Sequence, residues 1–274
     1  MTARHTARRL ATLGLAAALV ASLVACGSDG DDVAESGDPA TTAPVDAQTV
    51  TVFAASSLTD AFTEIGEGFE AANPGTTVEL SFGASSDLVD SITSGEALGT
   101  ADVFASADES NMDKLVEAGD EGAEPQVFAR NQAEIAVPAG NPAGITGIED
   151  FAEADLFLGV CAPEVPCGAY ARAVFDNAGV TPSIDSEEAK VTDVVAKVAS
   201  GELDGGIVYV TDVTADDDDV DGVEIPEEFN VDATYPIATV AEAPSADGAT
   251  AFVDYVLSDA GQAVLADHGF LPPS

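Results

Sequence analysis

The amino-acid sequence predicts an α/β fold of two lobes, in which helices cover sheets of largely parallel strands. Strand-like and helix-like apolar patterns alternate from residue 49 onward, an order that is typical of parallel sheets. Two consecutive strand-to-helix turns are built from the same small residues, Ala and Ser. The chain has 274 residues, of which 46% are hydrophobic, so it has enough apolar material for one or two domains.

The N-terminus has the layout of an export signal. Three arginines precede an apolar stretch over residues 10–20, and no acidic residue occurs before Asp29. The segment Leu23–Cys26 resembles the lipobox of bacterial lipoproteins, in which Cys26 becomes the lipid-carrying first residue. We therefore expect a lipoprotein signal peptide over residues 1–25. The alternative is a transmembrane anchor, but a span needs about 20 apolar residues and this run is shorter.

Acidic residues dominate the rest of the chain. The sequence has 50 Asp and Glu against 8 Lys and Arg, a formal net charge of -42, which excludes a nucleic-acid binder with a basic patch. Residues 26–48 contain little that could enter a core, so we expect a flexible acidic tether there. Beyond residue 26 no apolar run reaches 18 residues, so the sequence predicts that any membrane link lies at the N-terminus.

The folded body begins with two similar units of strand, turn and helix. Ser57 lies in the first turn and Ser85 in the second, and apolar residues recur at helical spacing after each. A third strand leads through Ser106, Ala107 and Asp108 to a third helix. The predicted strands cover residues 49–53, 76–82 and 101–105, and the predicted helices begin at Leu58, Asp87 and Met112.

Past Phe128 the alternation continues as a second unit. Its apolar patterns are again those of buried strands and amphipathic helices, and glycines follow several of the helices. The last helix is predicted as one long terminal helix. Strands are predicted over 132–140, 155–160, 205–210 and 233–240, and helices over 170–179, 193–201 and 250–269.

The two serine turns indicate an anion-binding site. The first N–H groups of a helix lack intrahelical partners and carry partial positive charge, so they attract anions. A serine hydroxyl adds a donor at the same place, and in open parallel sheets ligands bind beyond the carboxyl ends of the strands. The alternative is that Ser57 and Ser85 only cap their helices.

Two cysteines remain once Cys26 is assigned to the lipid. Cys161 and Cys167 are six positions apart, and an exported protein in an oxidising compartment would pair them as a disulfide. Two free buried thiols are the alternative. A zinc site is disfavoured because no histidine lies near them.

Several segments together resemble the molybdate-binding proteins of ABC importers, in order and over nearly all of residues 49–274. The resemblance implies a type II periplasmic-binding-protein fold, with two α/β lobes and a ligand cleft between them. It places lobe 1 at residues 49–127 plus 234–274 and lobe 2 at residues 128–233. The segments are VTVFAASSLTDAF, SFGASSDLVDSI with ADVFASAD, CAPEVPCGAYARAVF, KVTDVVAKVASGELDGGIVYVTDV and TYPIATV.

The same resemblance implies a set of neutral donors around the oxyanion. Ser57 and Ser85 would each give a hydroxyl and a backbone N–H from lobe 1. From lobe 2, Cys167 and Val194 would give backbone N–H groups and Tyr209 its phenol. Cys167 departs from the family pattern, which often has alanine there, but only the main-chain N–H is needed. The alternative for Tyr209 is a core tyrosine at a strand end.

The expected function is that of an extracytoplasmic, lipid-anchored binding protein. It would capture molybdate or tungstate as a monomer and deliver it to the membrane permease of an ABC importer, with no cofactor, no protein-coordinated metal cation and no catalytic residue. A fully ionised oxyanion needs donors only, whereas phosphate at neutral pH keeps a proton. Sulfate remains an alternative ligand, and a surface interaction lipoprotein without a ligand is the alternative function.

Other classes fit the sequence poorly. Neither serine turn matches G-x-S-x-G, no P-loop occurs, and His268 is the one histidine after the signal peptide. Four tyrosines are too few for a clustered ferric site. Residues 217–228 match the calcium-loop pattern, but the segment after them does not read as the required second helix, so we expect an acidic loop over 216–228.

Overall fold

The computed structural model describes residues 48–216 and 218–273. The strands are β1 Gln48–Ala55, β2 Thr76–Gly83, β3 Val103–Ala105, β4 Gln126–Pro138, β5 Leu158–Cys161, β6 Ser186–Glu188, β7 Gly205–Tyr209, β8 Val220–Glu224 and β9 Asp232–Thr239. The helices are α1 Thr59–Ala72, α2 Ser85–Thr93, α3 Glu109–Ala118, α4 Pro166–Ala178, α5 Val191–Ala199, α6 Val210–Ala215, α7 Ala246–Leu257 and α8 Asp259–Asp267, with short 3-10 helices η1 Ser56–Leu58 and η2 Ile148–Ala152.

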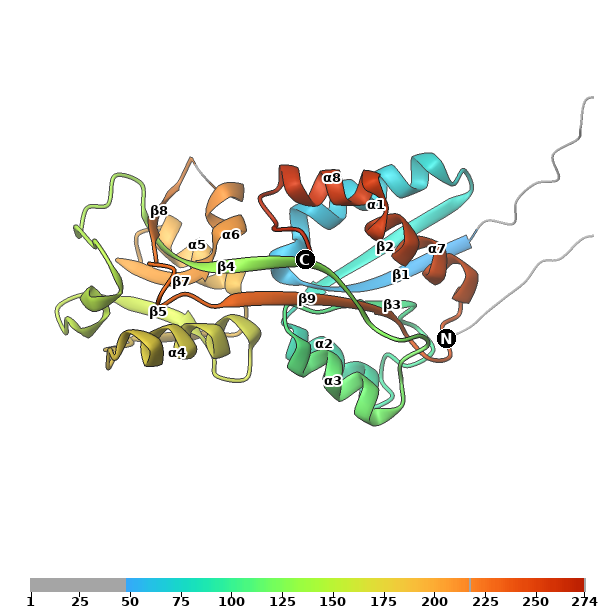
Figure 1. Cartoon of the computed structure of the whole chain (residues 1–274), viewed down its shortest axis with the longest axis horizontal. Helices are drawn as coiled ribbons and strands as arrows, with labels where there is room; N and C mark the ends of the chain where they lie inside the picture. The colour runs from blue at the N-terminus through green and yellow to red at the C-terminus, as the bar shows by residue number, and fades with distance from the viewer. Residues whose placement is uncertain (1–47, 217, 274) are drawn as a thin grey trace, which may run out of the picture. The chain divides into compact units, whose positions relative to one another are not determined.

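The strands join in one continuous order. Their sequence across the sheet is β2-β1-β3-β9-β4-β7-β5-β6, and β8 pairs with β4 outside this path. Helices lie against both halves of the arrangement, so the predicted α/β class with two lobes is confirmed (Figure 1). Within residues 48–216 and 218–273 no helix has the length and apolar character needed to cross a bilayer.

The first half of the sheet is centred on β1, which is parallel to both β2 and β3. The spacing of Phe62, Ile65 and Phe69 places all three on the inner face of α1, where they are buried as predicted. The rings of Phe62 and Phe69 contact Phe252 of α7 edge-on, with centroid distances of 6.1 and 5.4 Å. This packing holds α1 directly behind η1 at the carboxyl end of β1.

The second half is centred on β7 and β5. The two strands are parallel, β6 adds a further parallel strand to β5, and β4 is antiparallel to β7. Ile135, Leu158 and Ile207 of three adjacent strands are fully buried, which is typical of strands covered on both faces. The strand β7 therefore ends at Tyr209 in the interior of the molecule.

Two long strands connect the halves. β4 and β9 lie side by side and antiparallel, with a register from Gln126 opposite Ile237 to Gln132 opposite Asp232 (Figure 1). β9 continues into pairing with β3, and β4 continues into pairing with β7. The residues at which the sequence analysis placed its lobe boundaries, 127/128 and 233/234, both fall within this ladder.

The structure corrects three predicted elements. The terminal helix is two helices, α7 and α8, because Ser258 adopts an extended backbone and its hydroxyl caps Gly261 at the start of α8. β4 begins earlier than predicted, since residues 126–131 gain their hydrogen-bond partners from β9. The segment after Tyr209 forms helix α6.

The acidic segment contains a strand. Asp221 and Gly222 lie in β8, paired with β4, and the Asp221 carboxylate accepts a hydrogen bond from the Gly140 N–H. A strand through the middle of residues 217–228, which match the calcium-loop pattern, is incompatible with the helix-flanked loop of an EF-hand. At the other end of the chain, His268 is the residue that ends α8, where its Nε2 lies 2.9 Å from Glu64 Oε2.

Candidate anion-binding site

A small cavity lies where the two halves of the sheet meet, at the carboxyl ends of β1, β2 and β7. The free space between its walls, including the part open to solvent, is about 190 Å³, and among the described residues that line it none is charged. Helix N-termini from both halves reach it, so backbone N–H groups converge on it from several directions. The lining residues are Ala55, Ser56, Ser57, Gly83, Ala84, Ser85, Ala107, Val165, Pro166, Cys167, Val191 and Tyr209.

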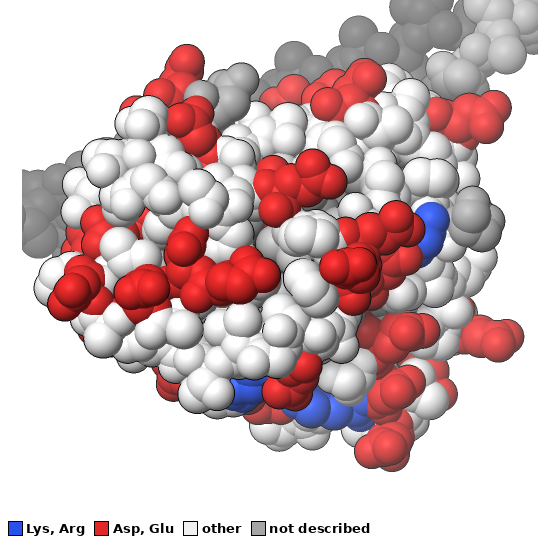
Figure 2. All heavy atoms as spheres, turned by 60° about the vertical axis from the view of Figure 1, so that its left-hand side comes forward, with Lys and Arg blue, Asp and Glu red and all other residues white. Residues whose placement is uncertain are grey.

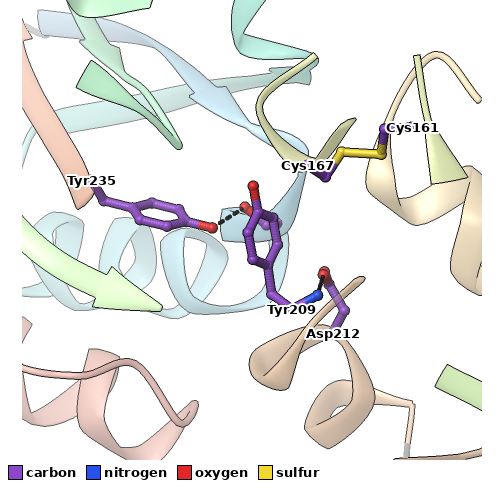
Figure 3. Close-up of a disulfide and its surroundings, with 6 residues drawn as sticks. Cys161, Cys167, Tyr209, Asp212 and Tyr235 are labelled. Atoms are coloured by element: carbon purple, nitrogen blue, oxygen red, sulfur yellow. Dashed lines mark hydrogen bonds between the residues drawn. A yellow bond between two sulfur atoms is a disulfide. The ribbon is translucent and has the colours of Figure 1, made fainter. Parts of the chain in front are cut away.

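Ser57 reaches the cavity from η1, the single turn that follows β1. Its hydroxyl lies 3.0 Å from the phenol oxygen of Tyr235, the bond that the dashed line at Tyr235 marks in Figure 3. The residue preceding η1 is Ala55, and no side chain caps this turn. Ser57 therefore does not act as a helix cap, and its hydroxyl is held by a partner on β9.

Ser85 is the first residue of α2 and is almost fully buried, with 1% exposure. Its oxygen accepts a hydrogen bond of 3.0 Å from the Ala107 N–H, so its own hydrogen remains to be donated elsewhere. The N-cap of α2 is Ala84, which has no capping side chain. The capping interpretation of the two serines is therefore wrong.

Cys167 is the second residue of α4 and forms a disulfide with Cys161 at the end of β5, so the predicted pairing is confirmed (Figure 3). The bridge joins the strand end to the first turn of the helix, with the two Cα atoms 5.6 Å apart. A Cβ at Gly168 would collide with the carbonyl oxygens of Ala162 and Cys161. The loop is thus packed closely against the start of α4, which fixes the position of the Cys167 N–H.

Tyr209 ends β7, and its phenol extends toward Cys167 (Figure 3). The ring packs edge-on against Tyr170 and Tyr235, with centroid distances of 6.2 and 6.0 Å. Its hydroxyl is buried and has no hydrogen-bond partner among the described residues. Burial raises the pKa of Tyr209 well above its usual value, so the phenol keeps its hydrogen and faces the cavity as a donor.

The fifth predicted residue, Val194, does not line the cavity. It is the fourth residue of α5, and the N–H at this position is the first that normally bonds within its own helix. Val191, the first residue of the same helix, does line the cavity. Sequence reasoning missed Val191 because the exact start of a helix is poorly marked when no capping side chain precedes it, as at Lys190.

Asp212 is hydrogen-bonded to the backbone of Tyr209. Its carboxylate accepts a 2.9 Å hydrogen bond from the Tyr209 N–H (Figure 3). Burial raises the pKa of Asp212 to about 7, the hydrogen bond from Tyr209 opposes this shift, and the charge of Asp60 adds to it. The carboxyl group thus changes charge near neutral pH, next to the strand end that carries the phenol.

This raised pKa predicts a pH dependence of stability. The folded protein holds a proton on Asp212 more tightly than the unfolded chain does, so the group contributes stability below about pH 4 that is lost as the pH rises to about 7. Asp212→Asn keeps the acceptor for the Tyr209 N–H and removes the titration. The melting temperature of the variant relative to the parent should rise between about pH 4 and 7 and then level off. A difference that does not vary with pH would contradict the assignment.

Comparison with known proteins places the chain among binding proteins. The family model for bacterial extracellular solute-binding proteins matches residues 50–271. The molybdate-binding protein ModA of Mycobacterium tuberculosis is 40% identical over 264 residues, covering 96% of this chain and 98% of its own.

Two solved structures share the fold. The periplasmic molybdate-binding protein of Azotobacter vinelandii superimposes with a TM-score of 0.72 at 18% identity, over 82% of this chain and 100% of its own. The sulfate-binding protein SubI of Mycobacterium tuberculosis gives 0.73 at 20% identity, over 82% and 87%.

Proposed function

The chain belongs to the family of bacterial extracellular solute-binding proteins, and we propose that its ligand is molybdate or tungstate. Its relatives are substrate-binding proteins of ABC transporters, so it is a binding protein and not an enzyme, and it works outside the cytoplasm with an importer permease. The relative from Mycobacterium tuberculosis, named for molybdate binding, matches almost the whole chain, which supports the choice of ligand.

The observation that carries the proposal is the chemistry of the cavity. A fully ionised tetrahedral oxyanion accepts hydrogen bonds only, and the cavity offers hydroxyls from Ser57, Ser85 and Tyr209. Backbone N–H groups of Cys167 and Val191, at the starts of α4 and α5, complete the proposed donor set. Val191 takes the place that the sequence analysis gave to Val194, since Val191 is the residue of α5 that faces the cavity.

The direct test is a calorimetric titration of the purified protein with molybdate, tungstate, sulfate and phosphate. We expect molybdate and tungstate to bind most tightly, and phosphate to bind weakly because its proton finds no acceptor. If sulfate binds most tightly, the ligand is sulfate and not molybdate, and the proposed site is unchanged. Absence of binding to all four anions would favour the interaction lipoprotein instead.

We further propose that the protein is held at the membrane by a lipid on Cys26 and acts as a monomer. Cys26, the signal peptide over residues 1–25 and most of the tether over 26–48 lie outside the described residues, so the proposal is supported by the sequence pattern alone. Mass spectrometry of membrane-extracted protein should find an acylated Cys26 as the first residue. An unmodified Cys26 in that material would contradict it.

The proposed lobes are residues 49–127 plus 234–274 and residues 128–233. Their support is the β4–β9 ladder. β9 pairs with β3 of the first half, β4 pairs with β7 of the second half, and the two strands pair with each other between the halves. The two crossing points then lie close together on this ladder, with Val127 opposite Pro236 and Thr234 opposite Arg130. Bending of this ladder would open and close the cavity between the halves.

The surface charge predicts how salt affects ligand capture. Asp and Glu side chains spread over the visible face, and Lys and Arg appear in few places (Figure 2). Arg130, Arg172, Lys190 and Lys197 each lie within ion-pair distance of a carboxylate. At low salt this field should repel a dianion, so the association rate measured by stopped flow should rise severalfold from about 0.05 to 2 M sodium chloride. A flat or falling rate would show that the net charge does not govern capture.

A further inference from the structure

Tyr235 lies in the interior of the molecule, on strand β9 where the two halves of the sheet meet. Its side chain is fully buried, with 0% exposure, and it is not among the residues that line the cavity. Its phenol oxygen lies 3.0 Å from the hydroxyl of Ser57 in the first half, and its ring packs against Tyr209 of the second half (Figure 3). Tyr235 thus contacts one proposed donor from each half without lining the ligand site itself.

Three aromatic rings hold the ring of Tyr235 in place. The ring centroids lie 6.0 Å away for Tyr209, 6.2 Å for Phe128 of β4, and 5.5 Å for Phe270 in the segment after α8. The interplanar angles are 69°, 90° and 78°, so all three contacts are edge-on, a geometry that aromatic pairs favour. Because the ring is buried and contacted from three sides, close packing fixes the position of its phenol oxygen.

The backbone at Tyr235 coincides with an irregularity in the crossing strands. The β4 residues Val127 and Ala129 lie opposite Pro236 and Tyr235, which are consecutive in β9. Phe128 is therefore an extra residue in β4. An extra residue of this kind bends its strand and increases the local twist. Tyr235 therefore lies at the bend of the β4–β9 ladder, between the two halves of the sheet.

The Ser57 hydroxyl depends on this fixed phenol for its orientation. Ser57 lies in the single turn η1 and is half-buried. A serine hydroxyl has three staggered positions about the Cα–Cβ bond, and the hydrogen bond to Tyr235 favours one of them. Burial raises the pKa of Tyr235, so the phenol keeps its hydrogen and can donate it to the Ser57 oxygen while Ser57 donates to the ligand.

Ser85 provides a contrast within the same cavity. Its oxygen accepts a 3.0 Å hydrogen bond from the backbone N–H of Ala107, and its side chain is 1% exposed. A backbone donor from the first half of the sheet therefore orients Ser85. The orientation of Ser85 does not require a side chain from the crossing strands, whereas that of Ser57 does.

We propose that Tyr235 is a positioning residue for oxyanion binding, which orients the Ser57 hydroxyl toward the cavity from the bend between the two halves. This inference rests on the proposed oxyanion function and deepens it, since it names a residue outside the site on which one of the donors depends. A donor that is already oriented loses less conformational entropy when the ligand binds, which raises the affinity. The ring contact places the same residue against Tyr209, the donor from the second half.

The test is a double-mutant cycle on Tyr235 and Ser57, measured by calorimetric titration with molybdate. Tyr235→Phe keeps the ring and removes the phenol oxygen that holds Ser57. The ligand then has to order the Ser57 hydroxyl itself, so the affinity should fall about three- to tenfold. In a Ser57→Ala background the same change should alter the affinity less than about twofold, because the hydroxyl that Tyr235 orients is already absent.

Ser85→Ala is the matched background for this cycle. Because the Ala107 N–H orients Ser85, Tyr235→Phe should lower the affinity about three- to tenfold there as well, as it does in the parent. Phe270→Leu tests the same dependence by a second variant. It removes one of the rings that hold Tyr235, lies outside the cavity lining, and should weaken binding in the parent but not in Ser57→Ala.

The outcomes separate this proposal from the proposed function. A parent protein that binds no oxyanion would overturn the proposed function itself. If the parent binds molybdate and Tyr235→Phe binds it equally well, Tyr235 does not position Ser57. An equal fall in affinity in the parent and in Ser57→Ala would show a general loss of packing and would also overturn the proposal. The same two results for Phe270→Leu decide the question if Tyr235→Phe does not fold.

Discussion

Replacement of Ser85 by alanine should weaken molybdate binding about tenfold or more and also destabilise the unliganded protein. The lost hydroxyl is a donor to a dianion, a charge-assisted bond of about 1.5 to 3 kcal/mol. The same oxygen accepts from the buried Ala107 N–H, which would lose its partner at a cost of about 1 to 3 kcal/mol. Calorimetric titration and urea unfolding of the unliganded protein measure the two effects separately.

Ser57→Ala should show both effects as well. The partner of Ser57 is the buried Tyr235 phenol, 3.0 Å away, which would lose this bond at a cost of about 1 to 3 kcal/mol. The matched control is Ser86→Ala, because Ser86 is buried in the same turn as Ser85, lies outside the cavity lining, and has a hydroxyl without a partner among the described residues. Its affinity should equal that of the parent. If all three variants bind molybdate equally, the cavity is not the ligand site.

The sequence predicted well those parts of the fold that depend on local patterns. The burial of Phe62, Ile65 and Phe69 follows from their spacing alone, and the turns at Ser57 and Ser85 follow from the change of period between strand and helix. The break at Ser258 was missed because the residues around it fit one continuous helix, and only the packing of two helices decides otherwise. The early start of β4 depends on β9, which is about a hundred residues away.

The residues of the candidate site also differ in whether local sequence patterns predict them. Ser57, Ser85, Cys167 and Tyr209 each lie at the end or start of a predicted element, so sequence could place them, and the structure brings all four to one cavity. The bond between Ser57 and Tyr235 could not be predicted, because it joins the turn after β1 to the distant strand β9. The same holds for the Ala107 N–H behind Ser85, which comes from the loop after β3.

Tyr209→Phe should have opposite effects on stability and binding. A buried hydroxyl without a hydrogen-bond partner costs about 1 to 3 kcal/mol, so its removal should stabilise the unliganded protein by about 1 kcal/mol or more. The phenol faces the cavity as a donor, so the same change should weaken molybdate binding about tenfold or more. A variant that gains stability but loses affinity would show that the Tyr209 hydroxyl serves ligand binding and destabilises the unliganded fold.

Tyr170→Phe provides the matched control for this prediction. Tyr170 packs against Tyr209, but it lies outside the cavity lining. Removal of its hydroxyl should therefore leave the affinity for molybdate unchanged. Urea unfolding without ligand and titration with molybdate give both quantities for each variant. If Tyr209→Phe loses stability and keeps its affinity, Tyr209 is a core residue at a strand end and not a ligand donor.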